Sequence, residues 1–199
     1  MTAPTGYDLL LPPGWLRVPL DRTRARRFVR YLVAARAAGQ PSDSVAPVRM
    51  ALEREVLASV DRAADAGVRD LFLLSEQRHG LPVAASLTVT EVPVAAATES
   101  GDLAGRLGES GTETTSVTLP CGPAVRMERV TAPGPVAPEP GDTAPPVPSV
   151  VVEYVVAVPG PGPYLLLTFS SPTLQVREAM VALFDALAGT LRWRWPGAG

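Results

Sequence analysis

The chain has 199 residues, 46% hydrophobic and 19% charged, which predicts one globular domain spanning 1–199. Its formal net charge is −2 and its eighteen basic residues are all Arg, which excludes a lysine Schiff base and an ordinary P-loop. A single His and a single Cys exclude an intrachain Cys/His zinc site and an internal disulfide. The use of Arg in place of every Lys indicates a high-GC genome, such as that of an actinobacterium.

The N-terminal third is predicted to hold an edge strand and two helices. The Pro-Pro-Gly-Trp sequence at 12–15 predicts a rigid turn, and alternating apolar residues predict a short strand over 16–20. Asp21 as N-cap begins a predicted helix over 21–38. Its apolar residues at helical spacing are Phe28, Tyr31, Leu32 and Ala35. A second helix is predicted over 47–66.

The periodicity then changes from helical to alternating, which predicts a sheet. A compact apolar run at 71–74 and an alternating run at 83–89 predict a hairpin whose turn holds His79. Residues 94–110 are ambiguous, with a short helix predicted from Ser100 to Leu107.

A second hairpin and a long loop follow. Strands are predicted over 114–119 and 124–130, joined by a four-residue turn at 120–123. Seven prolines within nineteen residues then predict a Pro-rich surface loop at 131–149, inside the single domain.

The longest uncharged stretch, 154–176, has the length of a membrane span but contains four prolines. It therefore predicts no integral membrane segment and instead a third hairpin, with strands at 150–158 and 164–169 around a stiff turn at 159–163.

The C-terminal part predicts a helix and a last extended segment. Ser171 as N-cap and Pro172 at the first position begin the helix, which ends at Gly189. Its apolar face consists of Val176, Met180, Leu183, Phe184 and Leu187. Residues 191–195 alternate Leu, Arg and Trp in an extended pattern. The predicted fold class is therefore α+β, an antiparallel sheet of about seven strands packed with three helices.

No residue pattern predicts a catalytic, cofactor-binding or metal site. His79 and Cys121 both fall in predicted turns, and Asp61 and Asp65 share a helix face with an Arg that favours a solvated acidic surface. The glycines of 101–108 do not match a dinucleotide fingerprint. The chain is therefore predicted not to be an enzyme, and a metal-dependent hydrolase built on Asp and Glu is the open enzymatic alternative.

The first predicted helix carries the strongest charge feature, six Arg against one Asp. Arg22, Arg26 and Arg30 form one row, in which each like-charge pair costs about 0.2–0.5 kcal/mol, so the row favours an acidic neighbour. Acids of the second helix, an acidic protein partner, and an anionic membrane surface or nucleic acid are the open interpretations. Trp193 and Trp195 have two interpretations, an aromatic cover over the core or an exposed contact site.

Five short segments together resemble the PsbP-like fold over nearly the whole chain. They are PPGW at 12–15, LPVAAS at 81–86, LLTFSSP at 166–172, FDAL at 184–187 and TLR at 190–192. The family includes a photosystem subunit, a Ran-binding import factor, mycobacterial LpqN-type lipoproteins and Eag-type effector chaperones. The resemblance implies an αβα sandwich used as a binding or adaptor module, and it assigns no functional residue.

These observations predict a non-catalytic adaptor or chaperone-like accessory protein, associated with a secretion or contractile-injection system, that binds another protein and no cofactor. Arg22, Arg26, Arg30, Trp193 and Trp195 are its candidate contact residues. The first fifteen residues lack a signal sequence, so a cytoplasmic location is expected. The net charge of −2 argues against nucleic acid as the partner, while a homo-oligomer is compatible with the sequence. The alternatives are a structural subunit of a larger assembly and a peripheral membrane-binding protein that uses the Arg-rich helix.

Overall fold

A computed structural model describes residues 3–36, 57, 60–61, 63, 66–78, 81–93, 112–131, 148–160 and 162–197. Its elements in chain order are β1 (Gly6–Asp8), β2 (Trp15–Val18), α1 (Arg22–Arg36), β3 (Val68–Arg78), β4 (Leu81–Val92), β5 (Glu113–Leu119), β6 (Gly122–Thr131), β7 (Ser149–Ala157), β8 (Tyr164–Ser171), the 3₁₀-helix η2 (Leu174–Val176), α4 (Arg177–Ala188) and β9 (Arg192–Arg194).

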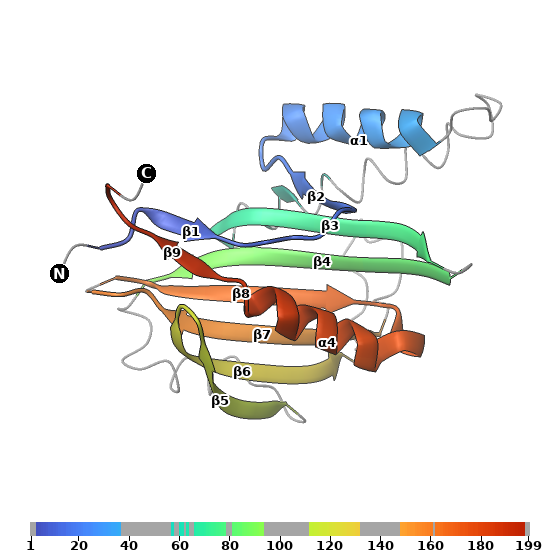
Figure 1. The fold of residues 1–199 in the computed structure, drawn as a ribbon. Coiled ribbons are helices and arrows are strands. Elements are labelled where there is room, and N and C mark those ends of the chain that lie inside the picture. Colours follow the sequence, from blue (N-terminus) through green and yellow to red (C-terminus); the bar gives the residue numbers. More distant parts are fainter. Residues whose placement is uncertain are drawn as a thin grey trace.

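Seven of the strands form one antiparallel sheet in the order β2-β3-β4-β8-β7-β6-β5 (Figure 1). The α+β class and the seven-stranded antiparallel sheet are therefore confirmed. The three predicted hairpins are present as β3–β4, β5–β6 and β7–β8. In the middle of the sheet β4 pairs with β8, with Leu87 opposite Phe169, so strands about eighty positions apart in sequence meet there.

The main core lies between the sheet and α4. The helix crosses β7 and β8, and its Phe184 is fully buried and stacks on Phe169 with ring centroids 5.1 Å apart (Figure 1). Apolar side chains alternate along the strands because successive residues face opposite sides of the sheet. This face therefore collects every second residue of β4, β8 and β7, and the predicted apolar face of the last helix packs on them.

A second, smaller core lies on the opposite face of the sheet. Ala25 and Val29 of α1 pack against Val18 and Leu71. Leu71 and Leu74 lie on opposite faces of β3, and Leu74 belongs to the core under α4, so α1 and α4 cover different faces of the sheet.

Of the second predicted helix, 47–66, only 57, 60–61, 63 and 66 lie within the described residues, and the first four of these positions are helical. Leu57 and Val60 are buried in the smaller core. The structure gives bounds for two α-helices, α1 and α4.

The buried stripe of α1 differs from the predicted one. Asp21 is the N-cap as predicted, because the backbone N–H of Arg24 donates to its Oδ1 at 2.8 Å. Tyr31, however, is 73% exposed, whereas Ala25 and Val29 are fully buried. At 100° per residue Tyr31 lies about 160° away from Val29, so a helix that buries Val29 turns Tyr31 to solvent.

The start of the last helix was predicted wrongly. Ser171 and Pro172 carry the signals of an N-cap and a first helical position, but Ser171 is the last residue of β8 and is fully buried. Its hydroxyl donates to the carbonyl of Ala84 at 2.7 Å. The helix α4 therefore begins only at Arg177, because pairing in the sheet continues to the point where helix signals already occur.

The last extended segment pairs outside the main sheet. β9 and β1 form a separate two-stranded ribbon in which Tyr7 lies opposite Trp193. β1 was not predicted, because three residues are too few to show alternation. Tyr7 and Trp193 pack against the core under α4, so the ribbon lies on that face of the sheet.

The turns follow their residue types. Trp15 N–H donates to the Pro12 carbonyl at 3.4 Å, and Gly14 has φ 99°, which is the positive φ that a type II turn with Pro13 before it requires. The predicted four-residue turn at 120–123 is shorter in the structure, because Leu119 pairs with Gly122. Residues 79–80, 94–111 and 132–147 lie outside the described residues, and with them the predicted short helix and most of the Pro-rich loop. The two ends of that loop, Thr131 and Ser149, belong to β6 and β7 and pair with each other.

Candidate functional site

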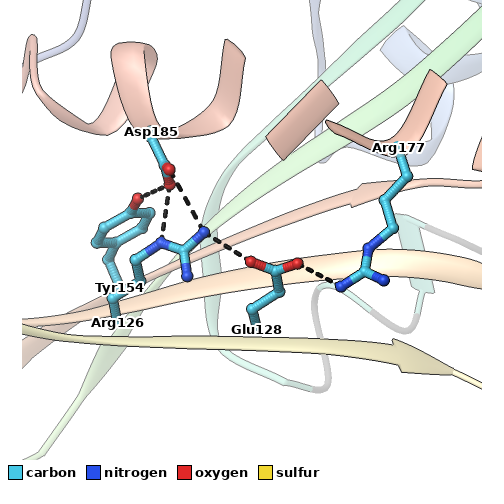
Figure 2. Close-up of polar contacts among 5 residues, drawn as sticks. All are labelled: Arg126, Glu128, Tyr154, Arg177 and Asp185. Carbon is cyan, nitrogen blue, oxygen red and sulfur yellow. Dashed lines mark hydrogen bonds and ion pairs between the residues drawn. The ribbon is translucent and has the colours of Figure 1, made fainter. Parts of the chain in front are cut away.

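A connected polar cluster lies between α4 and the strands β6 and β7 (Figure 2). Arg126 donates to Asp185 from two nitrogens, Nε to Oδ1 at 2.9 Å and Nη2 to Oδ2 at 3.4 Å. Glu128 accepts from Arg126 Nη2 at 2.8 Å and from Arg177 Nη2 at 2.6 Å. The hydroxyl of Tyr154 also donates to Asp185. Each of the four carboxylate oxygens therefore accepts at least one hydrogen bond.

Sheet geometry brings these side chains together. Arg126 and Glu128 are two residues apart on β6 and so face the same side, and Arg126 lies directly opposite Tyr154 on β7. Asp185 follows the buried Phe184 on α4 and therefore lies at the flank of the helix stripe that faces the sheet. The cluster thus joins the helix to two strands beside its apolar contact.

The surroundings change the pKa values of three of these groups. Burial raises the pKa of the Tyr154 hydroxyl, and its hydrogen bond to Asp185 raises it further. Burial alone would raise the pKa of Glu128, but the hydrogen bonds from Arg177 and Arg126 outweigh it and the net pKa is lowered. For Arg126, burial is outweighed by the two carboxylates, so its pKa is raised. All three groups are therefore held in the protonation state that they have at neutral pH.

An open hollow of about 830 Å³ lies beside the cluster. Its apolar walls come from Leu174, Val176 and Val181, and its polar walls include Glu128 and Arg177. Glu128 and Asp185, which line it, are already bound by guanidinium groups, which hold them as fixed acceptors and leave them poorly suited to proton transfer. The arrangement stabilises the position of α4 on the sheet.

This cluster was not predicted from the sequence. The carboxylates considered there lie on the second predicted helix, and of these Asp61 makes an ion pair with Arg22 at 3.2 Å. The signal for the observed cluster was present on β6, where Arg126 and Glu128 occupy the face on which Ala124 is buried. Two opposite charges on the buried face of a strand indicate an internal ion pair.

Two carboxylates elsewhere among the described residues, Asp70 and Glu153, are buried and also have hydrogen-bond donors. Asp70 accepts from Tyr7 and Arg17, and burial followed by the hydrogen bond to Asp70 raises the pKa of the Tyr7 hydroxyl. On the opposite face of the sheet Glu153 accepts from Arg129, and also from Thr168 at 3.1 Å.

The predicted contact residues on α1 lie on its exposed side. Arg22 contacts Asp61, so an acid of the second predicted helix neutralises one end of the row, as one of the open interpretations held. Arg26 and Arg30 are exposed. In the part of the chain that the structure describes, Arg30 has no carboxylate partner.

The two C-terminal tryptophans are placed differently from each other. Trp193 is half-buried, packs against the core under α4, and donates from its indole Nε1 to the carbonyl of Cys121 at 2.8 Å. Trp195 is 40% exposed. The structure does not bring these tryptophans to the Arg row, which lies on α1 at the other face of the sheet.

Of the single Cys and the single His, only Cys121 lies within the described residues. Cys121 is half-buried in the β5–β6 turn, and burial raises the pKa of its thiol, which lowers its nucleophilic reactivity at neutral pH. His79 lies outside the described residues.

No described helix is long and apolar enough to cross a bilayer. Within the same residues, no group of three or more His, Cys, Asp or Glu side chains is arranged to hold a metal ion. Comparison with known proteins adds no relative, because no protein-family profile and no curated protein sequence matches this chain.

Proposed function

We propose that the protein is a non-catalytic binding module that takes an acidic protein surface as its partner. The observation that carries this proposal is the exposed face of α1. Arg24, Arg27 and Arg30 are exposed there around Tyr31, which is 73% exposed. In the described part of the chain none of these three guanidinium groups has a carboxylate partner.

The composition of this face fits recognition of a protein. Arg and Tyr are enriched at protein interfaces, because the guanidinium binds carboxylates in two-point geometry and the tyrosine ring adds apolar contact area. The face projects from a helix whose other side is fixed by Ala25 and Val29, so it is presented on a rigid support. A rigid cationic surface favours fast, salt-dependent association with an acidic partner.

The internal charges support a role without chemistry. Glu128 and Asp185, beside the described hollow, are bound by Arg126 and Arg177, whereas a hydrolase built on carboxylates needs oxygens that are free to bind a metal or a proton. These ion pairs favour a structural role for Glu128 and Asp185.

The narrower proposal is an adaptor or chaperone-like factor of a secretion or contractile-injection apparatus, acting in the cytoplasm. It rests on the resemblance of five segments to the PsbP-like fold. The large antiparallel sheet with helices on both faces agrees with that resemblance.

The experiment is cross-linking in the native host with the whole chain and a charge-reversed variant. The triple variant Arg24→Glu, Arg27→Glu, Arg30→Glu is expected to lose a stoichiometric protein partner that the native chain retains. A control variant, Arg192→Glu, reverses an exposed charge on β9, away from α1, and is expected to retain the partner. Equal recovery of partners by the native and triple variants would overturn the proposal. Salt-sensitive binding to anionic vesicles, with no protein partner, would favour the membrane alternative.

A further inference from the structure

The two edges of the seven-stranded sheet are built differently. At one edge β2 is four residues long, carries Arg17, and is followed at once by Pro19. These are the devices by which proteins prevent another strand from adding to an edge. At the other edge β5 lies beside β6 and has no second neighbour among the described strands (Figure 1).

β5 has less of this protection, because its one charged residue, Glu113, and the following Pro120 stand at its two ends and leave the strand between them without charge or proline. It is seven residues long, it contains no proline, and it pairs with β6 without a bulge. Its only charged residue is Glu113, at its first position. The residues from Glu113 to Ser116, and also Thr118, are exposed, so side chains on both faces of this strand reach solvent.

We propose that β5 is the edge at which two copies of this chain pair, strand against strand, about a twofold axis at Ser116. A twofold axis perpendicular to the sheet places the two β5 strands antiparallel, and one sheet then runs through both copies. The backbone N–H and C=O groups on the outer edge of each β5 satisfy each other.

The sequence of β5 is complementary to itself in this register. Ser116 lies opposite its own copy, Thr114 lies opposite Thr118, and Thr115 lies opposite Val117. Threonine pairs and threonine–valine pairs are favourable neighbours on a sheet. Glu113 lies opposite Leu119, so the two copies of the only charged residue sit at opposite ends of the interface and no like charges face each other.

The same composition indicates a reversible pair. Five of the seven residues are Glu, Thr or Ser, so the edge is polar and lacks the continuous apolar surface that drives open-ended aggregation. β2, the other edge, is protected, so pairing through β5 closes after two copies. We therefore expect a dimer that dissociates on dilution.

The inference is independent of the proposed contact face. α1 packs beside β2 and β3, at the end of the sheet away from β5 (Figure 1). A pair joined through β5 therefore presents two copies of the exposed α1 face. A variant that cannot form the β5 pair is expected to bind the acidic partner at its α1 face as the native chain does. The failure of one proposal therefore leaves the other intact.

The test uses sedimentation velocity on the full chain over a concentration series. The native chain is expected to pass from monomer to dimer, and Ser116→Lys is expected to stay monomeric because it places two ammonium groups opposite each other. Thr114→Lys is the matched control, because its opposite residue is Thr118, and it is expected to retain the dimer. Mixing Ser116→Lys with Ser116→Asp is expected to restore a heterodimer.

Three results would overturn the inference. The first is a native chain that stays monomeric up to about 1 mM, a concentration at which even weak specific pairs form. The second is an unchanged dimer in Ser116→Lys. The third is a loss of the dimer in Thr114→Lys that equals the loss in Ser116→Lys, with no heterodimer in the mixture. Urea midpoints equal to that of the native chain show that the variants are folded, since both positions are exposed.

Discussion

Single side chains decide how firmly α4 is held on the sheet. Arg126 is only 16% exposed and serves two carboxylates, whereas Arg177 is 46% exposed and serves one. Removing a partner from a shielded ion pair leaves a charge without compensation, while an exposed pair is screened by water. The contribution of each arginine to stability therefore depends more on how far it is shielded from water than on the number of ion pairs it makes.

The first prediction compares these two arginines. Arg126→Ala is expected to lower the free energy of unfolding by about 1–3 kcal/mol, because Asp185 is left with Tyr154 and Glu128 with Arg177 as donor. Arg177→Ala is expected to cost less than about 1 kcal/mol. Urea unfolding of both variants measures the difference, and equal losses would contradict the assignment of Arg126 as the central donor.

The second prediction concerns alkaline pH. Burial, and then hydrogen bonds to Asp70 and Asp185, raise the pKa values of Tyr7 and Tyr154 above the ordinary 10.0. The unfolded chain therefore releases these protons at lower pH than the folded chain does. Their contribution to stability is fully present below pH 10 and is lost as the pH rises above it.

Urea midpoints at about pH 9 and about pH 11 test this prediction, since the two values bracket the ordinary tyrosine pKa. The native chain is expected to lose stability between them, and Tyr7→Phe with Tyr154→Phe is expected to lose less. The same decline in both chains would show that other groups cause it.

At the scale of elements, α1 combines a buried stripe with a face of like charges. Repulsion between arginines three or four positions apart disfavours the helix, and Ala25 and Val29 offset it by burial in the smaller core. A surface that costs stability and is nevertheless present is typical of a contact site.

The third prediction follows from that cost. Arg27→Glu places a carboxylate three positions from both Arg24 and Arg30, and is expected to raise the free energy of unfolding by about 0.2–0.5 kcal/mol per new pair. The same change is expected to weaken binding of the acidic partner. Urea unfolding checks the expected gain in stability, and partner cross-linking on the same preparation checks the expected loss of binding. A destabilised variant would contradict the role given to repulsion between the arginines.

The fourth prediction concerns the β1–β9 ribbon. Trp193→Ala removes a half-buried ring and the hydrogen bond to the Cys121 carbonyl, and is expected to cost about 2–4 kcal/mol. Trp195→Ala, at a position 40% exposed, is expected to cost less than about 1 kcal/mol. Thermal unfolding compares them, and a larger loss in Trp195→Ala would reverse the placement.

Local patterns predicted the strands well, because the alternation of apolar and polar residues and the residue types of tight turns can be recognised within a few consecutive residues. The start of α4 was predicted wrongly because Ser171 and Pro172 carry a local helix signal, while pairing with Val150 across the sheet holds Ser171 in a strand. The charges of Arg126 and Glu128 on β6 indicate an internal ion pair, but Asp185 lies fifty-nine positions from Arg126, and no local pattern indicates that partner.

At the scale of the whole molecule, the sheet depends on segments distant in sequence. The central pairing of β4 with β8 forms only after the chain through β7 and β8 has returned to the first hairpin. Such long-range pairing is associated with slow folding, in milliseconds to seconds. The pairing of β4 with β8 joins the part of the sheet made of β2, β3 and β4 to the part made of β8, β7, β6 and β5.

The fifth prediction maps that dependence by hydrogen exchange. Amides of β4, β8 and β7 are expected to exchange only by global unfolding, and those of β1 and β9 by local opening, because the ribbon has three residue pairs. Amides of β5 are expected to become more protected as the protein concentration rises. Concentration-independent exchange in β5, together with a monomer by sedimentation, would count against pairing at that edge.

The ribbon of β1 and β9 also fixes how the molecule responds to force. Gly6 pairs with Arg194 and Asp8 pairs with Arg192. The pair that lies nearest to the two chain ends, Gly6 with Arg194, is therefore also the outermost pair of the ribbon. Tension applied to the two ends loads these pairs one after another, as in a zipper. The ribbon opens at low force and draws Tyr7 away from Asp70 before any strand of the main sheet bears load.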